Sequence, residues 1–459
     1  MDLSLHVALV PVGSHGDVHP LVGIGRGLLA RGHAATVVTN AHFEPLARRN
    51  GLGFVATSTA ADYHQIMADP DLWRGRRGFD AIARHVMALA EPTFDAIARL
   101  RAEHGDRLVV VGTSLAFGAR VAQEAFGVPA ATVHLSPAVF QSAHDMPKYA
   151  GLWVPPGAPT WAKRLLYKLI NRVVDRALAG PVNAFRARHG LPPVRGIFER
   201  WWDSPDLVLA TFPAWFAAPQ PDWPPQARVV GFPLYDERDA TPLPPELDAF
   251  LAAGPPPVAF TPGSAMAQGQ AFFAASADAC RRAGLRGVLL TRHRGQVPAA
   301  LPPGVVHADY APFSELLPRC AAVVHHGGIG TSAQALAAGC PQLVQPFAHD
   351  QPDNAARLAR LGVARVVSPR RYTPARAARV LAELTTSTEV AERCREVAGW
   401  VRGTDAVGAA CDAIEALGAR HRARADERDH DRHPERGPAT APPRTSDDVS
   451  PSPAGIGRG

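Results

Sequence analysis

Short apolar stretches alternate with amphipathic segments along most of the chain. In the first half, the expected strands are residues 6–12, 35–39, 108–112 and 130–134, and the expected helices are residues 21–31 and 116–126. The second half starts the pattern again, with expected strands at residues 258–261, 287–290, 305–308, 322–324 and 343–345. Because strands and helices alternate, this order predicts an α/β protein built on doubly wound parallel sheets.

A proline-rich, charged run at residues 233–257 separates the two halves and is the expected linker. We therefore expect an N-terminal domain over residues 1–232 and a C-terminal domain over residues 258–418, whose last helix can pack back on the N-terminal domain. Residues 419–459 are rich in Arg, His, Asp and Pro and have few large apolar side chains. Such a segment buries too little apolar surface to offset the entropy of ordering, so we expect a disordered tail.

The most informative local pattern begins with a glycine turn at residues 325–330, directly after an apolar run. Thr331 and Gln334 have the spacing of a capping box, which predicts a short helix over residues 332–338. Glycines let backbone N–H groups approach a ligand closely, and a helix N-terminus carries positive dipole charge. The turn is therefore a candidate phosphate site.

Polar residues follow the next expected strand, residues 342–345, at its carboxyl end. They are His349, Asp350, Gln351 and Asn354. Parallel α/β sheets keep their ligands at this edge, and such side chains suit sugar hydroxyls. The alternative is a structural turn without a ligand, in which the adjacent histidines satisfy buried backbone groups.

Together these residues resemble the nucleotide-sugar signature of the family 1 glycosyltransferases, in its bacterial form HHGGxGT followed by a DQ pair. The resemblance implies the GT-B fold, in which two Rossmann-like domains face each other across a cleft that holds the site. It also implies roles for particular residues. The donor diphosphate would bind Gly328, Ile329, Gly330 and Thr331, with either His325 or His326, and the transferred sugar would bind Asp350 and Gln351.

The same resemblance extends to the nucleotide. Tyr310 and Ala311 occupy the place of the family's WxPQ element, whose aromatic ring stacks on the base, although the tryptophan is lost. Ser264 resembles a residue of the loop that approaches the phosphates. Gln334 stands where plant UDP-sugar enzymes use a glutamate for the ribose, which is compatible with dTDP, although an amide can also bond a ribose.

The first expected turn, residues 13–20, presents His15, Asp17 and His19 at the end of a strand. Transfer to an alcohol needs a base within hydrogen-bond reach of the acceptor hydroxyl. Asp17 can serve as that base or can cap the following helix. The turn resembles the GxxGDVxP element of bacterial family 1 enzymes, which implies that Asp17 is catalytic and that His15 and His19 are neighbours in the cleft.

One displacement by the activated hydroxyl would invert the anomeric carbon. Preorganised amides, a helix dipole and a histidine can stabilise the leaving diphosphate. The sequence has no DxD-type carboxylate pair in a convincing position for magnesium. We therefore expect a metal-independent enzyme with no cofactor, for which the nucleotide sugar is a substrate.

Several further segments resemble the bacterial rhamnosyltransferases that make mono-rhamnolipids. They are residues 13–20, 67–73, 212–216, 222–224, 231–234 and 348–351. This resemblance implies transfer of L-rhamnose from dTDP-L-rhamnose to a 3-(3-hydroxyalkanoyloxy)alkanoate lipid, and association with the acyltransferase that makes it. The alternatives are a UDP-glucose-dependent enzyme acting on a sterol, polyketide or phenolic acceptor, and a nucleotide-sugar binding or epimerising protein.

The composition of the chain narrows its possible partners and its location in the cell. The chain has 459 residues and a formal net charge of +6, but its basic residues are dispersed among acids, which argues against a nucleic-acid partner. Its five cysteines show neither the spacing of metal ligands nor that of a disulfide framework. We therefore expect the protein to lie in the reducing cytoplasm. Neither a signal-type N-terminus nor a membrane-spanning run is apparent, which leaves a soluble or peripheral protein.

One amphipathic stretch, residues 161–178, bears on a membrane contact. Its apolar residues Trp161, Leu165, Leu169 and Val173 recur at helical spacing beside basic residues. Such a stripe can meet the inner membrane surface or line a lipid entrance. We favour the alternative, in which the stripe is the core face of a surface helix.

Overall fold

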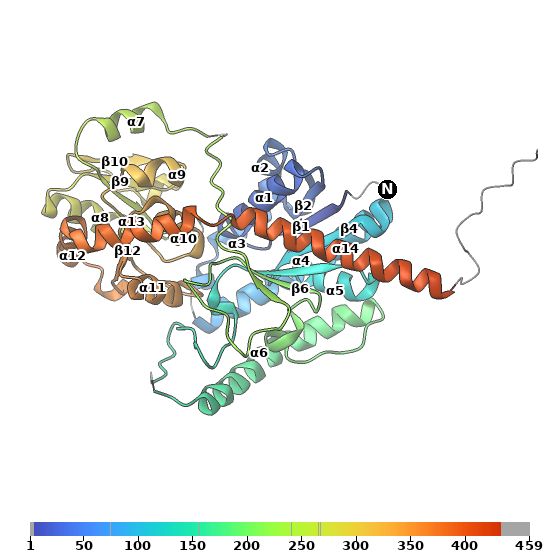
Figure 1. The fold of residues 1–459 in the computed structure, drawn as a ribbon. Coiled ribbons are helices and arrows are strands. Elements are labelled where there is room, and N and C mark those ends of the chain that lie inside the picture. The colour runs from blue at the N-terminus through green and yellow to red at the C-terminus, as the bar shows by residue number, and fades with distance from the viewer. Residues whose placement is uncertain are drawn as a thin grey trace, which may run out of the picture. The chain divides into compact units, whose positions relative to one another are not determined.

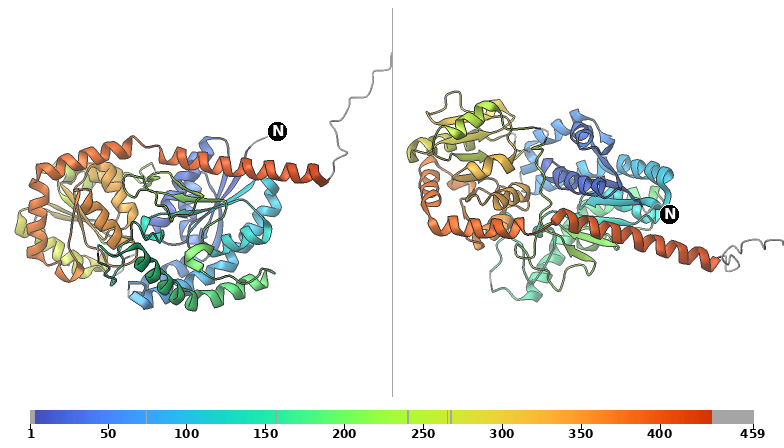
Figure 2. Two further views of the ribbon diagram at one scale, coloured as in Figure 1. Left: turned by 60° about the horizontal axis from the view of Figure 1, so that its bottom comes forward. Right: turned by 45° about the horizontal axis from the view of Figure 1, so that its top comes forward.

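The computed structural model describes residues 4–432, except for residues 74, 156, 240, 265 and 267. The described chain contains two parallel sheets (Figure 1). Both belong to one compact unit that ends at Gly418, and residues from Ala419 onward form a second unit. The predicted α/β class with two doubly wound sheets is confirmed, and helices cover both faces of each sheet (Figure 2).

The N-terminal sheet has seven strands in the order β3-β2-β1-β4-β5-β6-β7, and every neighbouring pair is parallel. The strands are β1 (His6–Val10), β2 (Ala34–Asn40), β3 (Gly53–Ser58), β4 (Leu108–Thr113), β5 (Ala130–His134), β6 (Leu207–Ala210) and β7 (Ala227–Val229). The helices are α1 (His15–Ala30), α2 (Glu44–Arg49), α3 (Ala60–Ala68), α4 (Gly75–His104), α5 (Phe117–Phe126) and α6 (Thr160–Arg188). Alternate β1 residues enter opposite cores, Val7 and Leu9 on one face and Ala8 and Val10 on the other.

The C-terminal sheet has six strands in the order β10-β9-β8-β11-β12-β13, again all parallel. The strands are β8 (Val258–Thr261), β9 (Gly287–Leu290), β10 (Val305–Ala308), β11 (Ala322–His325), β12 (Gln342–Val344) and β13 (Ala364–Val366). The helices are α7 (Pro245–Ala252), α8 (Gln270–Ala283), α9 (Phe313–Leu316), α10 (Ile329–Ala338), α11 (Gln351–Arg360), α12 (Pro374–Thr386) and α13 (Thr388–Arg402). Buried apolar strands of this kind are typical of parallel sheets covered on both faces.

Two expected helices begin earlier than their sequences suggested. Helix α1 starts at His15 rather than at residue 21, because Asp17 accepts a hydrogen bond from the Ser14 backbone and closes a capping box. Helix α10 starts at Ile329 rather than at residue 332, with Gly328 as its N-cap. Thr331 therefore lies inside the first turn of α10 and does not cap it.

The expected linker and tail both contain helix. Within residues 233–257, α7 buries Leu247 and Leu251 in a cluster shared with β8 and β9. The last helix, α14 (Ala406–Arg432), continues past residue 419, where we expected disorder to begin. Mixed charges among helix-forming residues explain how the helix extends without an apolar face. The rest of the expected tail, residues 433–459, lies outside the described residues.

The apolar stripe of α6 is exposed, so our expectation of a core face is wrong. Trp161, Leu165, Leu169 and Val173 are 69%, 52%, 49% and 52% exposed. The buried side of this helix consists of other residues, among them Tyr167, Asn171, Val174 and Leu178. Across the described part of the chain, none of the helices is both long and apolar enough to cross a bilayer.

Candidate functional site

The N-termini of α1 and α10 meet at the carboxyl ends of β1 and β11. A Cβ atom built on Gly330 in α10 would lie 3.9 Å from the Cα atom of Gly16 in α1. Two helix dipoles therefore direct partial positive charge and free backbone N–H groups toward the same place. This arrangement suits a ligand with negative charge, such as a diphosphate.

His326 lies at the centre of this region. Its imidazole fits between two glycines: Cβ atoms built on Gly263 and Gly328 would come within 2.6 Å and 2.3 Å of the ring. Its Nδ1 atom is buried and has no hydrogen-bond partner in the described chain. Burial lowers the pKa of His326 to about 3, so the ring is neutral and can hydrogen-bond a phosphate oxygen through a ring N–H.

His325 is placed differently, although sequence left both histidines open. Its side chain is fully buried, and its Nε2 atom lies 2.9 Å from Oε1 of Gln342. The Gly327 backbone N–H donates to the His325 Nδ1 atom at 3.1 Å. Both ring nitrogens are thus occupied within the C-terminal domain, so His325 supports the glycine turn from behind.

The expected sugar loop is joined to the glycine turn by Asn354. This fully buried side chain donates from Nδ2 to the Gly327 carbonyl at 2.9 Å and to Asp350 Oδ2 at 2.7 Å. Asp350 is the N-cap of α11 and also hydrogen-bonds the side chain of Ser136 from the N-terminal domain. Burial raises the pKa of Asp350 to about 6.

Gln351, which the resemblance assigned to the sugar, has an internal role in the structure. Its Oε1 atom accepts hydrogen bonds from the backbone N–H groups of Phe347 and Ala348 at 2.7 and 3.1 Å. The side chain is only 3% exposed. Gln351 therefore holds the loop in shape directly before Asp350, while His349 in that loop has a positive φ of 57°.

Asp17 lies in the N-terminal domain near Asp350. Its Oδ2 atom accepts the Ser14 backbone N–H at 2.7 Å, so the helix-capping role that we considered is present. Although part of its surface is exposed, the surrounding protein raises the pKa of Asp17 to about 7 by burial, and the charge of Asp350 adds to this effect. A carboxyl group with this pKa can exchange a proton near neutral pH.

The two expected neighbours of Asp17 lie in an aromatic cluster. The Nδ1 atom of His15 is 3.4 Å from the Tyr63 hydroxyl, and its ring packs edge-on against His42 and Phe43. Burial lowers the pKa of His15 to about 3. The Nε2 atom of His19 lies 3.3 Å from Oε1 of Glu237.

The expected nucleotide residues lie along one edge of the C-terminal domain. Tyr310 donates its hydroxyl to the Asp236 carbonyl at 2.6 Å, and the Arg292 guanidinium lies 5.1 Å from the centre of its ring. Ala311 is buried and Ser264 is exposed. Gln334 is 9% exposed, and its amide donates to the Tyr235 carbonyl at 3.4 Å.

Sequence reasoning missed the residues that connect the two domains at this site. Buried Arg357 in α11 pairs with Asp353 at 2.7 Å and with Asp145 of the N-terminal domain at 2.8 Å. Asp353 also accepts the Lys148 backbone N–H at 3.0 Å. These partners lie about 200 residues apart in sequence, and no local pattern marks them.

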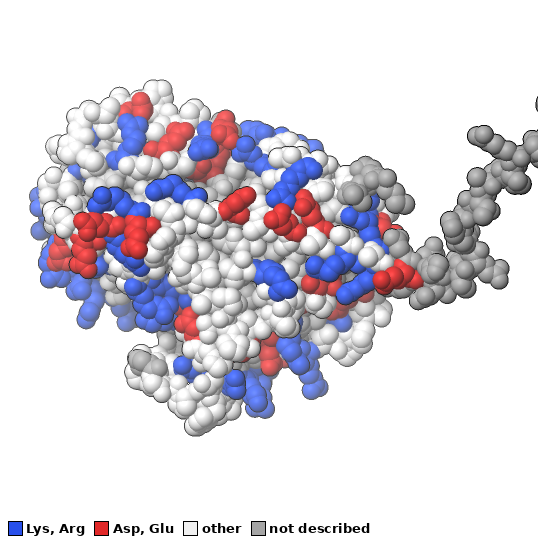
Figure 3. All heavy atoms as spheres, in the orientation of Figure 1, with Lys and Arg blue, Asp and Glu red and all other residues white. Residues whose placement is uncertain are grey.

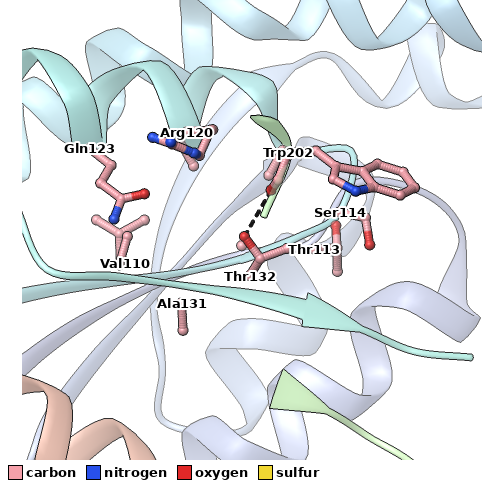
Figure 4. A pocket seen from close by; sticks show the side chains of 12 residues that line it. Val110, Thr113, Ser114, Arg120, Gln123, Ala131, Thr132 and Trp202 are labelled. Atoms are coloured by element: carbon pink, nitrogen blue, oxygen red, sulfur yellow. Dashed lines mark hydrogen bonds between the residues drawn. The ribbon is translucent and has the colours of Figure 1, made fainter. Parts of the chain in front are cut away.

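A separate polar pocket lies beneath α5 in the N-terminal domain (Figure 4). Thr132 donates a hydrogen bond to the Trp202 carbonyl there at 3.0 Å, and Ser114 also lines the pocket. Ser114 contacts His134 at 2.7 Å, and His134 contacts Asp203 at 2.7 Å. None of the predicted site residues lines this pocket.

Among the described side chains, no group of three or more His, Cys, Asp or Glu residues is arranged to hold a metal ion. The site residues themselves supply side chains, backbone amides and helix dipoles. A neutral histidine and two helix N-termini face one region, and two carboxyl groups with raised pKa values lie beside it.

The chain is similar to known proteins over most of its length. Residues 287–402 match the family model described as the C-terminal domain of erythromycin biosynthesis protein CIII-like proteins. The chain is 33% identical to the O-mycaminosyltylonolide 6-deoxyallosyltransferase of Streptomyces fradiae, over 90% of this chain and 97% of that protein.

Two solved structures show the same fold. The kitacinnamycin glycosyltransferase is 24% identical, with a TM-score of 0.67 over 90% of this chain and 99% of its own. A spinosyn rhamnosyltransferase complexed with thymidine diphosphate is 19% identical, with a TM-score of 0.65 over 90% of this chain and all of its own.

Proposed function

The chain belongs to the erythromycin biosynthesis protein CIII-like family of GT-B glycosyltransferases, and we propose that it moves L-rhamnose from dTDP-L-rhamnose to an acceptor hydroxyl. Transfer proceeds by one inverting displacement. The observation that carries the proposed transfer is that Asp17, in the first turn of α1, lies near the glycine turn before α10 and near Asp350, the N-cap of α11. Base and donor site are thereby brought together from the two domains.

Asp17 is the general base in this proposal. An ionised carboxylate removes the acceptor proton as the hydroxyl oxygen bonds to the anomeric carbon, and the carbon–oxygen bond to the diphosphate breaks. One Asp17 oxygen is used by the Ser14 amide, which fixes the orientation of the carboxylate. Its raised pKa makes it a stronger base than an ordinary aspartate, and about half of the molecules carry the ionised form at pH 7.

The leaving diphosphate is held by the start of α10. Backbone N–H groups around Gly328, Ile329, Gly330 and Thr331 and the helix dipole stabilise its growing charge. Between the two histidines we assign the direct contact to His326, because the ring nitrogens of His325 are already bonded within the domain. No metal takes part in this proposal.

Asp350 binds the sugar hydroxyls, while Gln351 and Asn354 keep the loop in place from behind. The thymine ring of the nucleotide would stack near Tyr310 and Ala311, and Ser264 would contact the phosphates. Gln334, where plant relatives use a glutamate, is compatible with the deoxyribose of dTDP. The thymidine diphosphate in the structurally similar spinosyn enzyme supports this choice of nucleotide.

We propose a 3-(3-hydroxyalkanoyloxy)alkanoate lipid as the acceptor, on the strength of the sequence resemblance to the rhamnolipid branch. With that acceptor, the enzyme would work at the inner membrane surface and next to the acyltransferase that makes the lipid. A polyketide acceptor is the second candidate. It is favoured by the similarity to an enzyme that glycosylates O-mycaminosyltylonolide.

A donor and acceptor screen tests the proposal. The enzyme is incubated with dTDP-L-rhamnose or UDP-glucose, and each donor is combined with the hydroxy lipid or with a macrolide aglycone. Mass spectrometry of the products should show a deoxyhexose added to the lipid. A hexose adduct alone would contradict the proposed donor. A macrolide adduct alone would move the acceptor to the second candidate, and donor binding without any adduct would exclude both acceptors.

A further inference from the structure

Helix α6 exposes a row of large apolar side chains to solvent. Trp161, Leu165, Leu169 and Val173 follow one another at intervals of four residues, and each is about half exposed or more. Trp153, in the segment before the helix, is 80% exposed. Apart from these five, the only large apolar side chain that is exposed in the described chain is Val366. Such a concentration on one element is typical of an interaction surface.

Basic side chains accompany this row. Arg164, Lys168, Arg172 and Arg176 also recur at intervals of four residues and are all exposed. Because residues four apart lie on the same side of a helix, the cations form a second row beside the apolar one. Figure 3 shows Lys and Arg side chains projecting at the bottom of the view, where α6 lies in Figure 1.

The exposed face of α6 from residue 161 to residue 176 presents no competing carboxylate. The one acidic residue in that span is Asp175, and its two oxygens accept the backbone N–H groups of Gly196 and Ile197 at 2.8 and 2.9 Å. The positive charge of the four cations is therefore not neutralised on their own face.

The opposite face of α6 contacts the segment at residues 141 and 142 of the N-terminal domain. Asn171 exchanges hydrogen bonds with Gln141 at 2.7 and 3.0 Å, and the Tyr167 hydroxyl donates to the Ser142 carbonyl at 3.3 Å. The segment that follows residue 142 contains Asp145, which pairs with Arg357 beside the candidate site. The segment that contacts α6 thus continues to a residue that pairs beside the candidate site.

We propose that this face of α6, defined by Trp161, Leu165, Leu169 and Val173 with the four cations, docks on an anionic lipid surface. The apolar row enters the boundary between headgroups and acyl chains, while the cations pair with lipid phosphates. This inference rests on the membrane contact of the proposed function, and it assigns that contact to the exposed face of α6. It does not depend on the donor or on the catalytic residues.

A second copy of the chain fits this face less well. An isologous dimer through α6 would bring the four cations of each copy together without a carboxylate between them, and like charges at an interface oppose association. An anionic lipid surface neutralises the same charges. Charge complementarity therefore selects the lipid surface over self-association.

Vesicle co-sedimentation of the purified full-length protein tests the proposal. Wild type should bind vesicles of phosphatidylcholine with phosphatidylglycerol, should bind pure phosphatidylcholine much more weakly, and should lose binding as salt is raised. The double variant Leu165→Gln, Leu169→Gln should bind roughly tenfold less or weaker still, since it removes two membrane-facing apolar side chains. The double variant Lys168→Gln, Arg172→Gln should lose roughly fivefold for each cation removed.

Matched controls are available on other elements. Val366→Gln removes an exposed apolar side chain, and Arg379→Gln removes a cation with a 65% exposed side chain, and both should bind vesicles like wild type. Thermal unfolding and donor binding should be unchanged in every variant, which separates loss of docking from loss of fold or of transferase function.

Three results would overturn the inference. The first is failure of wild type to bind anionic vesicles, and the second is wild-type binding by the α6 variants. The third is a dimer in sedimentation velocity that the Leu165→Gln, Leu169→Gln variant dissociates, in which case a second copy covers the face. None of these results bears on sugar transfer to a soluble acceptor, so the proposed chemistry is tested independently.

Discussion

Asp17 has an observed structural role, and we propose a chemical role for the same side chain. One oxygen closes the capping box at the start of α1, while burial shifts its pKa to about 7. Sequence presented these roles as alternatives, because the spacing of Ser14 and Asp17 fits a cap and the position of Asp17 fits a base. The geometry shows that the cap is compatible with catalysis, since it orients the carboxylate that we propose as the base.

The first residue-scale prediction concerns pH. The proposed mechanism needs the ionised form of Asp17, whose pKa is raised to about 7, so kcat/KM should level off above about pH 8 and should fall as the pH drops below about 7. His15, with its pKa lowered to about 3, stays neutral throughout this range. Initial rates from pH 5 to 9 check this. A profile that stays flat down to pH 5 would show that no group with a raised pKa limits the reaction.

The second residue-scale prediction separates the adjacent histidines. His326→Ala should weaken dTDP binding roughly tenfold, the effect of one hydrogen bond to a charged group, with little change in stability. His325→Ala should lower the free energy of unfolding by about 2 to 3 kcal/mol, because two buried hydrogen bonds and ring packing are lost. Calorimetric titration with dTDP and thermal unfolding of both variants provide the measurement. The reverse pattern would assign the diphosphate contact to His325.

At the scale of elements, the strands that the sequence predicted are present in the structure, whereas β3, β6, β7 and β13 were not predicted and the starts of α1 and α10 were placed too late. The expected strands at residues 130–134, 258–261, 287–290 and 305–308 match the structure residue for residue. Runs of buried apolar residues bounded by turns define such strands locally. The starts of α1 and α10 depend instead on which backbone N–H groups find a partner, which the hydrophobic pattern does not encode.

The exposed face of α6 was mispredicted because the hydrophobic pattern does not determine which side of a helix is buried. Intervals of four residues place side chains on one side of a helix, but they do not say whether that side meets the core or the solvent. In this helix the core side is a second set of residues at helical spacing, which includes Tyr167, Val174 and Leu178. The same spacing thus fits both interpretations, and only the packed structure distinguishes them.

The element-scale prediction concerns the connection between the sugar loop and the glycine turn. Asn354→Ala removes the two hydrogen bonds donated to Gly327 and Asp350, so it should lower the free energy of unfolding by about 1 to 3 kcal/mol and weaken nucleotide-sugar binding. Asn183→Ala is the matched control, since it loses two hydrogen bonds to Val194 in the N-terminal domain. That control should lose stability without a change in donor affinity. Equal donor affinity in both variants would contradict the connection.

At the scale of the whole molecule, the site depends on contacts between distant parts of the chain. Ser136 meets Asp350, Arg357 pairs with Asp145, and Gly16 lies opposite Gly330. Sequence motifs predicted most of the candidate residues in the two halves of this region, because each half follows a strand and a turn. They did not reveal the partners that join the halves, since those contacts span more than 200 residues and leave no local pattern.

The central claim is that donor binding and acceptor activation belong to different domains. Asp17→Asn tests it most directly, because the amide keeps an oxygen that can accept the Ser14 hydrogen bond but cannot remove a proton. Calorimetric titration with the nucleotide sugar should give an unchanged Kd, while kcat for transfer should fall about a hundredfold or more. Turnover like that of wild type, or loss of donor binding together with activity, would contradict the account.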